Sequence, residues 1–244
     1  MKFYDNFSEL NLLFSQPVHF TIYETNRFSP ITTFELQMPT FKLFSFNENL
    51  RYFVSLINAP ISDLQKQFPN IVDFQTHYQL ILGLILLQHP TLTQFLDVII
   101  DALRTLGINA TTRDSKGSIG LAINGVLIDE PLFTRIMRII LIALALKKQS
   151  DFVDDPQLQA YQEKINRIKS QNKSVTGNST DFNKAFMILT YEFGYKPEEI
   201  LNMTQYTINF ILGYTGKSIN YKLSLIAAGN GNTKKVKFIT DKGR

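Results

Sequence analysis

Residues 119–131 read Ile-Gly-Leu-Ala-Ile-Asn-Gly-Val-Leu-Ile-Asp-Glu-Pro, and this stretch decides the fold class. Two apolar runs flank the dipeptide Asn124-Gly125. Both turn residues accept the positive φ angles that a two-residue hairpin turn requires. The pattern therefore predicts a β-hairpin over residues 119–128, in the middle of the chain.

A helix is predicted directly after this hairpin. Asp129 precedes a periodic apolar segment and has the side chain of an N-cap, and Pro131 falls in the first helical turn, where proline is tolerated. The helix is expected to run from Leu132 to Lys148. Residues 111–118, before the hairpin, contain no apolar run and are expected to form a loop.

Upstream, residues 17–46 alternate between apolar and polar side chains, with prolines at positions 17, 30 and 39. Alternation with a period of two is typical of half-buried strands, so we expect two or three strands with turns at the prolines. The inward positions are Val18, Phe20, Ile22, Phe34, Leu36, Met38, Phe41 and Leu43.

From Asn47 the apolar period changes to that of a helix. Leu50, Phe53, Val54 and Ile57 form one helical stripe, and Pro60 stops it. Three more helices are expected over residues 61–68, with Ser62-Asp63 near its cap, over 73–88, and over 92–106, closed by Gly107.

The chain after residue 148 is predicted to be helical on both sides of a polar linker. An acidic hinge at 151–155 precedes a helix over 156–170, and residues 171–180 have the composition of a linker. Four short helices then follow: 181–193, ended by Gly194; 197–201; 205–214, capped by Thr204; and 218–228, capped by Ser218.

These elements define the expected organisation. The fold class is α+β and mainly helical, with a small N-terminal antiparallel sheet, a mid-chain hairpin and a C-terminal helical module. The expected divisions are a strand-then-helix domain (1–107), a hairpin with helices (108–170), a linker (171–180), a helical module (181–228) and a basic tail (229–244).

The net charge of +4 is concentrated in that tail. Residues 233–244 contain five basic residues and one acidic residue, so residues 1–232 carry equal numbers of each sign. A nucleic-acid-binding face normally shows basic residues clustered on folded elements, and no such cluster occurs here, so we expect no nucleic-acid partner. The tail is instead a candidate partner-binding segment through Lys234, Lys235, Lys237, Lys242 and Arg244.

Composition excludes several classes of protein. The chain has no cysteine, so disulfides, cysteine nucleophiles and thiolate metal sites are absent. The N-terminal residues lack the apolar core of a signal peptide, which favours an intracellular protein. The apolar runs 80–87 and 139–146 are far shorter than the roughly 20 residues of a spanning helix, so no membrane partner is expected.

The motif that most suggests catalysis is Gly216-Lys217-Ser218, which matches the last three residues of a phosphate-binding loop. Such a loop needs a glycine where this chain has Ile211, and it must follow a strand, whereas residues 204–214 have helical spacing. A helix end at Gly216 and a helix cap at Ser218 explain these residues better, so we expect no nucleotide cofactor.

The remaining titratable residues do not form a catalytic or metal-binding pattern. His19, His77 and His89 lack the spacing of metal ligands and are expected at the surface or at helix ends. The carboxylate pairs 129/130, 154/155 and 198/199 all fall at predicted helix starts, where anions offset the helix dipole. We therefore expect no catalytic residue, no cofactor and no metal, although an enzyme with an unrecognised site remains a third class.

The second half of the chain has a characteristic order of predicted elements: the hairpin Gly120–Asp129, the helix that begins Glu130-Pro-Leu-Phe, the acidic Asp154-Asp155-Pro156, and a final block. That block reads Phe193-Gly-Tyr-Lys-Pro-Glu-Glu-Ile-Leu-Asn-Met-Thr204-Gln-Tyr-Thr-Ile-Asn-Phe-Ile-Leu. In this order of elements, residues 119–228 resemble bacteriophage morphogenesis proteins of the tail-assembly and virion-structural kind found in phages of AT-rich Gram-positive hosts.

The resemblance implies a structural or assembly role in a phage tail, neck or baseplate, with no catalytic residues to carry over. The implied partners are other phage structural or assembly proteins, or further copies of this chain. The implied location is the virion or the host cytoplasm. The alternative is a cytoplasmic protein-binding or regulatory module without catalysis.

Overall fold

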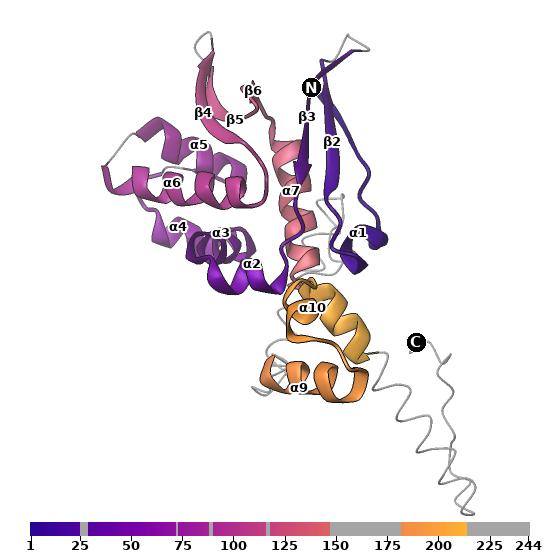
Figure 1. The fold of residues 1–244 in the computed structure, drawn as a ribbon. Coiled ribbons are helices and arrows are strands. Elements are labelled where there is room, and N and C mark those ends of the chain that lie inside the picture. The colour runs from indigo at the N-terminus through magenta and orange to yellow at the C-terminus, as the bar shows by residue number, and fades with distance from the viewer. Residues whose placement is uncertain (25–28, 72, 88–89, 116–117, 147–181, 214–244) are drawn as a thin grey trace, which may run out of the picture.

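The structure is a computed structural model, and it describes residues 1–24, 29–71, 73–87, 90–115, 118–146 and 182–213 (Figure 1). It confirms an α+β fold that is mainly helical. The strands are β1 (Lys2–Asp5), β2 (Val18–Tyr23), β3 (Pro30–Leu36), β4 (Ala110–Ser115), β5 (Ser118–Ile123) and β6 (Val126–Leu127). The labelled helices are α1 (Glu9–Leu13), α2 (Phe41–Phe46), α3 (Glu48–Asn58), α4 (Ile61–Gln67), α5 (His77–Leu87), α6 (Pro90–Thr105), α7 (Glu130–Ala143), α9 (Phe182–Phe193) and α10 (Pro197–Leu201). Residues 205–213 form one further helix.

The N-terminal sheet is antiparallel, in the order β1-β2-β3. Its inward positions are those that the alternation predicted: Val18, Phe20, Ile22, Phe34 and Leu36 are all buried. β1 and α1 were not predicted, because neither contains a long enough apolar period.

Of the two or three strands expected over residues 17–46, two form, namely β2 and β3. Residues 41–46 form α2 instead, and the Thr40 side chain caps this helix by accepting a hydrogen bond from the Leu43 N–H at 3.3 Å. The apolar residues of this segment fit a short helix as well as a strand, because Phe41 and Phe44 are three positions apart.

The second sheet is also antiparallel, in the order β4-β5-β6. The predicted hairpin is confirmed, with Asn124 at φ 50° and Gly125 at φ 76°. The predicted loop at 111–118 was wrong for residues 111–115 and for Ser118, which begins β5. Residues 111–115 belong to β4, which pairs with β5 through its backbone while Thr112, Arg113 and Asp114 are exposed.

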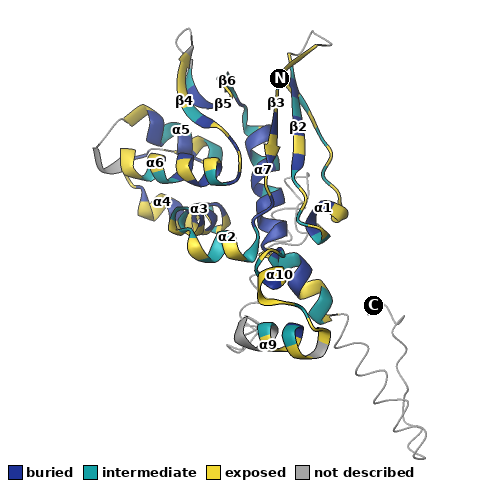
Figure 2. Cartoon of the chain, in the orientation of Figure 1, coloured by how far each residue is buried: buried dark blue, intermediate teal, exposed yellow. Residues whose placement is uncertain are grey.

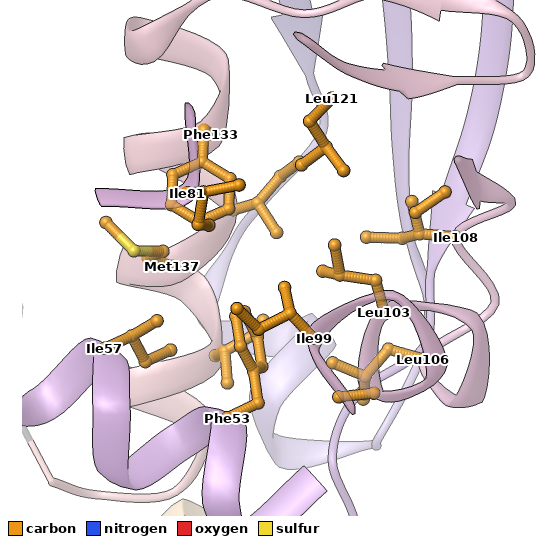
Figure 3. Close-up of a cluster of buried hydrophobic side chains, with 14 of the residues drawn as sticks. Phe53, Ile57, Ile81, Ile99, Leu103, Leu106, Ile108, Leu121, Phe133 and Met137 are labelled. Atoms are coloured by element: carbon orange, nitrogen blue, oxygen red, sulfur yellow. The ribbon is translucent and has the colours of Figure 1, made fainter. Parts of the chain in front are cut away.

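One hydrophobic core lies between these sheets and the helices α3, α5, α6 and α7 (Figures 1 and 2). It draws residues from both sides of position 107. Figure 3 shows its centre, where side chains of α3, α5, α6, the α6–β4 connection, β5 and α7 converge: Phe53, Ile57, Ile81, Ile99, Leu103, Leu106, Ile108, Leu121, Phe133 and Met137. The predicted stripe of α3 is buried at all four positions.

Several helix boundaries differ from the prediction. Pro60, rather than Ser62-Asp63, is the N-cap residue of α4. The proline ring makes no capping hydrogen bond. α5 begins at His77 rather than residue 73, and Asp73 has a positive φ of 54°, which a helix cannot include. α7 ends at Ala143, because Ala145 has φ 54° and the Leu146 N–H bonds back to the Leu141 carbonyl. The expected linker at 171–180 and the helices at 156–170 and 218–228 lie outside the described residues.

Candidate protein-binding surface

α9 exposes a set of apolar side chains on its outer side. Met187 is 55% exposed, Tyr191 is 80% exposed and Ile188 is 37% exposed. At about 100° per residue these three side chains share one sector of the helix. We call Met187, Ile188 and Tyr191 the α9 patch.

The inner side of α9 holds the helix in place. Leu189, on the side opposite the α9 patch, is fully buried in a small core with Ile200 of α10 and Ile208 of the helix 205–213. Gly194, at φ 72°, ends the helix with its N–H bonded to the Thr190 carbonyl at 3.1 Å. α9 is therefore apolar on two opposite sides, and among the described residues only the inner side is covered. Within the described residues, Figure 1 places α9 at the opposite end from the strands β4 and β5.

The C-terminal module consists, within the described residues, of α9, α10 and the helix 205–213. This last helix attaches the module to α1 through threonine hydroxyls. As predicted, Thr204 caps the helix, its Oγ1 accepting from the Thr207 N–H at 3.1 Å. The same hydroxyl donates to the Leu12 carbonyl at 3.0 Å, and the Thr207 hydroxyl lies 2.8 Å from that carbonyl. Both threonines are buried. They satisfy a carbonyl at the C-terminal end of α1 that has no partner within its own helix.

A second contact between these helices is electrostatic. The Tyr206 hydroxyl donates to Glu9 Oε1 at 2.5 Å. Partial burial of the ring, together with the hydrogen bond to the negative carboxylate, raises the pKa of Tyr206 to about 12. The phenol therefore stays protonated at neutral pH and acts as a fixed hydrogen-bond donor rather than as an acid or base.

Beside these contacts lie further exposed apolar side chains. On α1, Leu10 is 59% exposed and Phe14, at the C-cap, is 67% exposed. Phe210 follows Tyr206 by four positions, so it lies on the side of its helix that faces Glu9. Phe210 is also exposed.

Two surface clefts offer little for chemistry. The first, of about 360 Å³, lies between β3 and the β5–β6 turn and is lined by Met1, Glu24, Ile31, Arg113, Gly125, Val126 and Leu127. The second, of about 460 Å³, lies beside α7 and is lined by Phe3, Glu130, Pro131, Thr134, Arg135 and Arg138. Arg135 is committed to a bidentate ion pair with Asp5 (2.8 and 2.9 Å), which neutralises its charge.

Several titratable residues within the described ranges serve structural roles. His19 pairs with Glu35 at the surface, and His77 begins α5 with its Nε2 3.1 Å from the Ala59 carbonyl oxygen. Asp129 caps α7, as predicted, and Glu199 accepts from the Lys196 N–H at the start of α10. Among these residues no three His, Asp or Glu side chains are grouped as a metal would require.

Burial also raises the pKa of Tyr52 and Tyr78, and for Tyr78 the negative charges of Asp129 and Glu130 add to the effect. The Tyr78 hydroxyl donates to the Ile128 carbonyl at 2.5 Å. These upward shifts keep both phenols neutral, so neither is activated as a nucleophile or base.

The sequence-predicted site residues lie outside the described part of the chain. This applies to Lys234, Lys235, Lys237, Lys242 and Arg244, and to Gly216-Lys217-Ser218. Ile211 lies within the helix 205–213, as its spacing predicted. Sequence reasoning missed the α9 patch. The available signal was the unbroken apolar run Ala185–Leu189, which gives α9 two apolar sides.

Comparisons of this chain with protein-family models, with curated proteins and with solved structures find no match. Within the described ranges, no helix combines the length and the apolar character that crossing a membrane would require.

Proposed function

We propose that this chain is a non-catalytic assembly protein of a bacteriophage particle and that it binds another protein subunit through the α9 patch. The phage context rests on the resemblance of residues 119–228 to bacteriophage morphogenesis proteins, which lies in the order of the predicted elements. The observation that carries the binding role is that α9 exposes Met187, Ile188 and Tyr191 together, on the side turned away from its own core.

The energetics favour a protein partner. Full burial of a large apolar side chain contributes about 1.5–3 kcal/mol, so three such side chains supply several kcal/mol at the centre of an interface. Tyrosine is enriched at the residues that dominate binding, because its ring buries a large area at low entropic cost. α9 is already ordered by Leu189 on its inner side, so binding pays little further cost to order the helix.

The test is co-purification with the products of the neighbouring reading frames. We expect co-expression to give a complex of fixed stoichiometry by size-exclusion chromatography with light scattering. The double variant Met187→Ser/Tyr191→Ser should weaken this complex at least tenfold, since each lost anchor at an interface centre typically costs more than about 1 kcal/mol.

The matched control is Tyr4→Ser. Tyr4 is an exposed tyrosine on β1, away from α9, so its loss should leave the complex intact. An equal loss of binding in the Tyr4 and α9 variants would contradict the assignment of the surface. A complex that survives the α9 double variant would contradict it as well.

A further inference from the structure

The cleft between β3 and the β5–β6 turn takes its walls from both sheets (Figure 1). Its apolar lining consists of Met1 and Ile31 on one side and Val126 and Leu127 on the other. Ile31 is 45% exposed, and the other three residues are half-buried. The volume of about 360 Å³ falls at the small end of the range of about 300–1,000 Å³ that is typical of ligand sites. The cleft therefore offers apolar surface that a small ligand can remove from water.

Side-chain hydrogen bonds hold the two walls of this cleft in place. The Asn124 side chain, in the β5–β6 turn, donates from Nδ2 to the Thr33 carbonyl at 2.9 Å and so joins the second sheet to β3. Arg113 on β4 donates from Nη1 to the Gly125 carbonyl in the same turn. Because both walls are already fixed, a ligand pays little to order them.

The charges at the rim favour a ligand with a single carboxylate. Arg113 is exposed, and within the described part of the chain it forms no ion pair. The bond to Gly125 uses one of the five N–H donors of its guanidinium. Glu24 is the acidic residue of the lining, so a phosphate group with two negative charges would be repelled there. The Met1 ammonium group lies 4.0 Å from Asp129 Oδ2, which offsets its charge.

A strand edge in the cleft favours a peptide over other apolar carboxylates. β6 is the edge strand of its sheet, and it pairs with β5 through Val126 opposite Ile123 and through the Ile128 N–H, which donates to the Leu121 carbonyl at 3.0 Å. Alternate residues of an antiparallel strand bond to opposite sides, so the backbone N–H and C=O of Leu127 point away from β5. An extended peptide can form main-chain hydrogen bonds with such an edge.

We propose that this cleft binds the apolar C-terminal end of a partner polypeptide. The apolar side chains of that end pack on Ile31, Val126 and Leu127, and its terminal carboxylate pairs with Arg113. The rim is exposed at Glu24 and Arg113, so the bound chain continues outward into solvent. The inference does not depend on the proposed function, because the cleft contains no residue of the α9 patch.

The test is a titration of the full chain followed by ¹H–¹⁵N NMR, with acetyl-Leu-Leu as the probe for a polypeptide C-terminus. We expect a Kd of about 0.1–1 mM, which is typical of a probe of this size. The amide of the same probe lacks the carboxylate and should bind at least tenfold more weakly, because a charge-assisted hydrogen bond is lost. Equal affinities for acid and amide, or no binding in this range, would overturn the proposal. Unacylated Leu-Leu that binds tenfold more tightly than acetyl-Leu-Leu would assign the cleft to free peptides and overturn it as well.

Variants of the cleft test the assignment of the residues. Arg113→Gln should weaken binding of the acid at least tenfold and leave the affinity for the amide unchanged, whereas Arg51→Gln, at an exposed arginine on α3, should change neither.

A second variant covers the case in which loss of the bond to Gly125 disturbs the turn. Ile31→Asp places another anion in the cleft at an exposed position and should also weaken the acid at least tenfold. Its control is Phe46→Asp, at an exposed residue on α2 away from the cleft (Figure 1). Undiminished affinity in Arg113→Gln and Ile31→Asp, or equal losses in the two control variants, would contradict the proposed site.

Discussion

Replacing Arg135 by Met should destabilise the protein more than any other single change at an ion pair within the described residues. Arg135 on α7 forms two hydrogen bonds with Asp5 on β1, Nε to Oδ2 at 2.8 Å and Nη2 to Oδ1 at 2.9 Å. Its guanidinium also lies 5.3 Å from the centre of the Phe7 ring. The pair therefore joins the first strand to the central helix.

The expected loss in the free energy of unfolding follows from the exposure of the Asp5 and Arg135 side chains. Asp5 is 9% exposed, so Arg135→Met leaves a buried carboxylate whose remaining partner is the Phe7 N–H at 3.1 Å. Removing one member of a fully buried pair costs about 3–5 kcal/mol. Because Arg135 is 31% exposed and water can reach part of the site, we expect about 2–3 kcal/mol.

The assay is urea unfolding followed by far-ultraviolet circular dichroism, with an unchanged denaturant slope as the check on two-state behaviour. The control is Arg51→Met, which breaks an exposed pair with Glu48 (3.5 Å) and should cost less than about 0.5 kcal/mol. The double variant Asp5→Leu/Arg135→Met should be more stable than Arg135→Met alone, because it removes the unpaired charge. A cost below 1 kcal/mol for Arg135→Met, or one equal to the control, would refute the reasoning.

Three further predictions concern helix ends and the attachment of the module. Ala145→Gly should stabilise the protein by about 0.5–1 kcal/mol in the same urea assay, because Ala145 has φ 54°, which glycine adopts without strain; a loss of stability would count against this. Thr207→Val should cost about 1–2 kcal/mol, because the buried Leu12 carbonyl loses a hydroxyl partner, and a neutral result by thermal unfolding would contradict that contact. The pKa of Tyr206 is raised to about 12, above its ordinary 10.0, so the stability that it contributes should be intact below pH 10 and lost as the pH rises from 10 to 12. Tyr206→Phe should lose less stability than the wild type across that interval, and parallel pH profiles would contradict the Glu9 contact.

Apolar periodicity predicted the elements that bury one clear face. The stripe of α3 and the inward positions of β2 and β3 were correct because burial selects the side chains at those positions. The turn at Asn124-Gly125 and the cap at Asp129 were correct because local backbone geometry selects those residue types. Each of these signals is contained within a few consecutive residues.

β4 was missed because backbone pairing with β5 holds it in the sheet while much of its length faces solvent. Its side chains therefore carry no alternating apolar signal. The α9 patch was missed for a related reason. The sequence predicted the helix, but which of its two apolar sides is covered depends on how α10 and the helix 205–213 dock on it. Such docking is a tertiary property and leaves no local pattern.

The central claim is that the α9 patch binds another subunit during particle assembly, and the most direct measurement is the yield of assembled particles. Met187→Ser/Tyr191→Ser would be introduced into the genome that encodes the chain, and particles would be counted by electron microscopy beside a Tyr4→Ser strain. Both proteins should unfold within a few degrees of the wild type, because the replaced side chains are exposed. We predict at least a tenfold loss of complete particles for the α9 variant and none for Tyr4→Ser. A normal particle yield from a stable α9 variant would contradict the account.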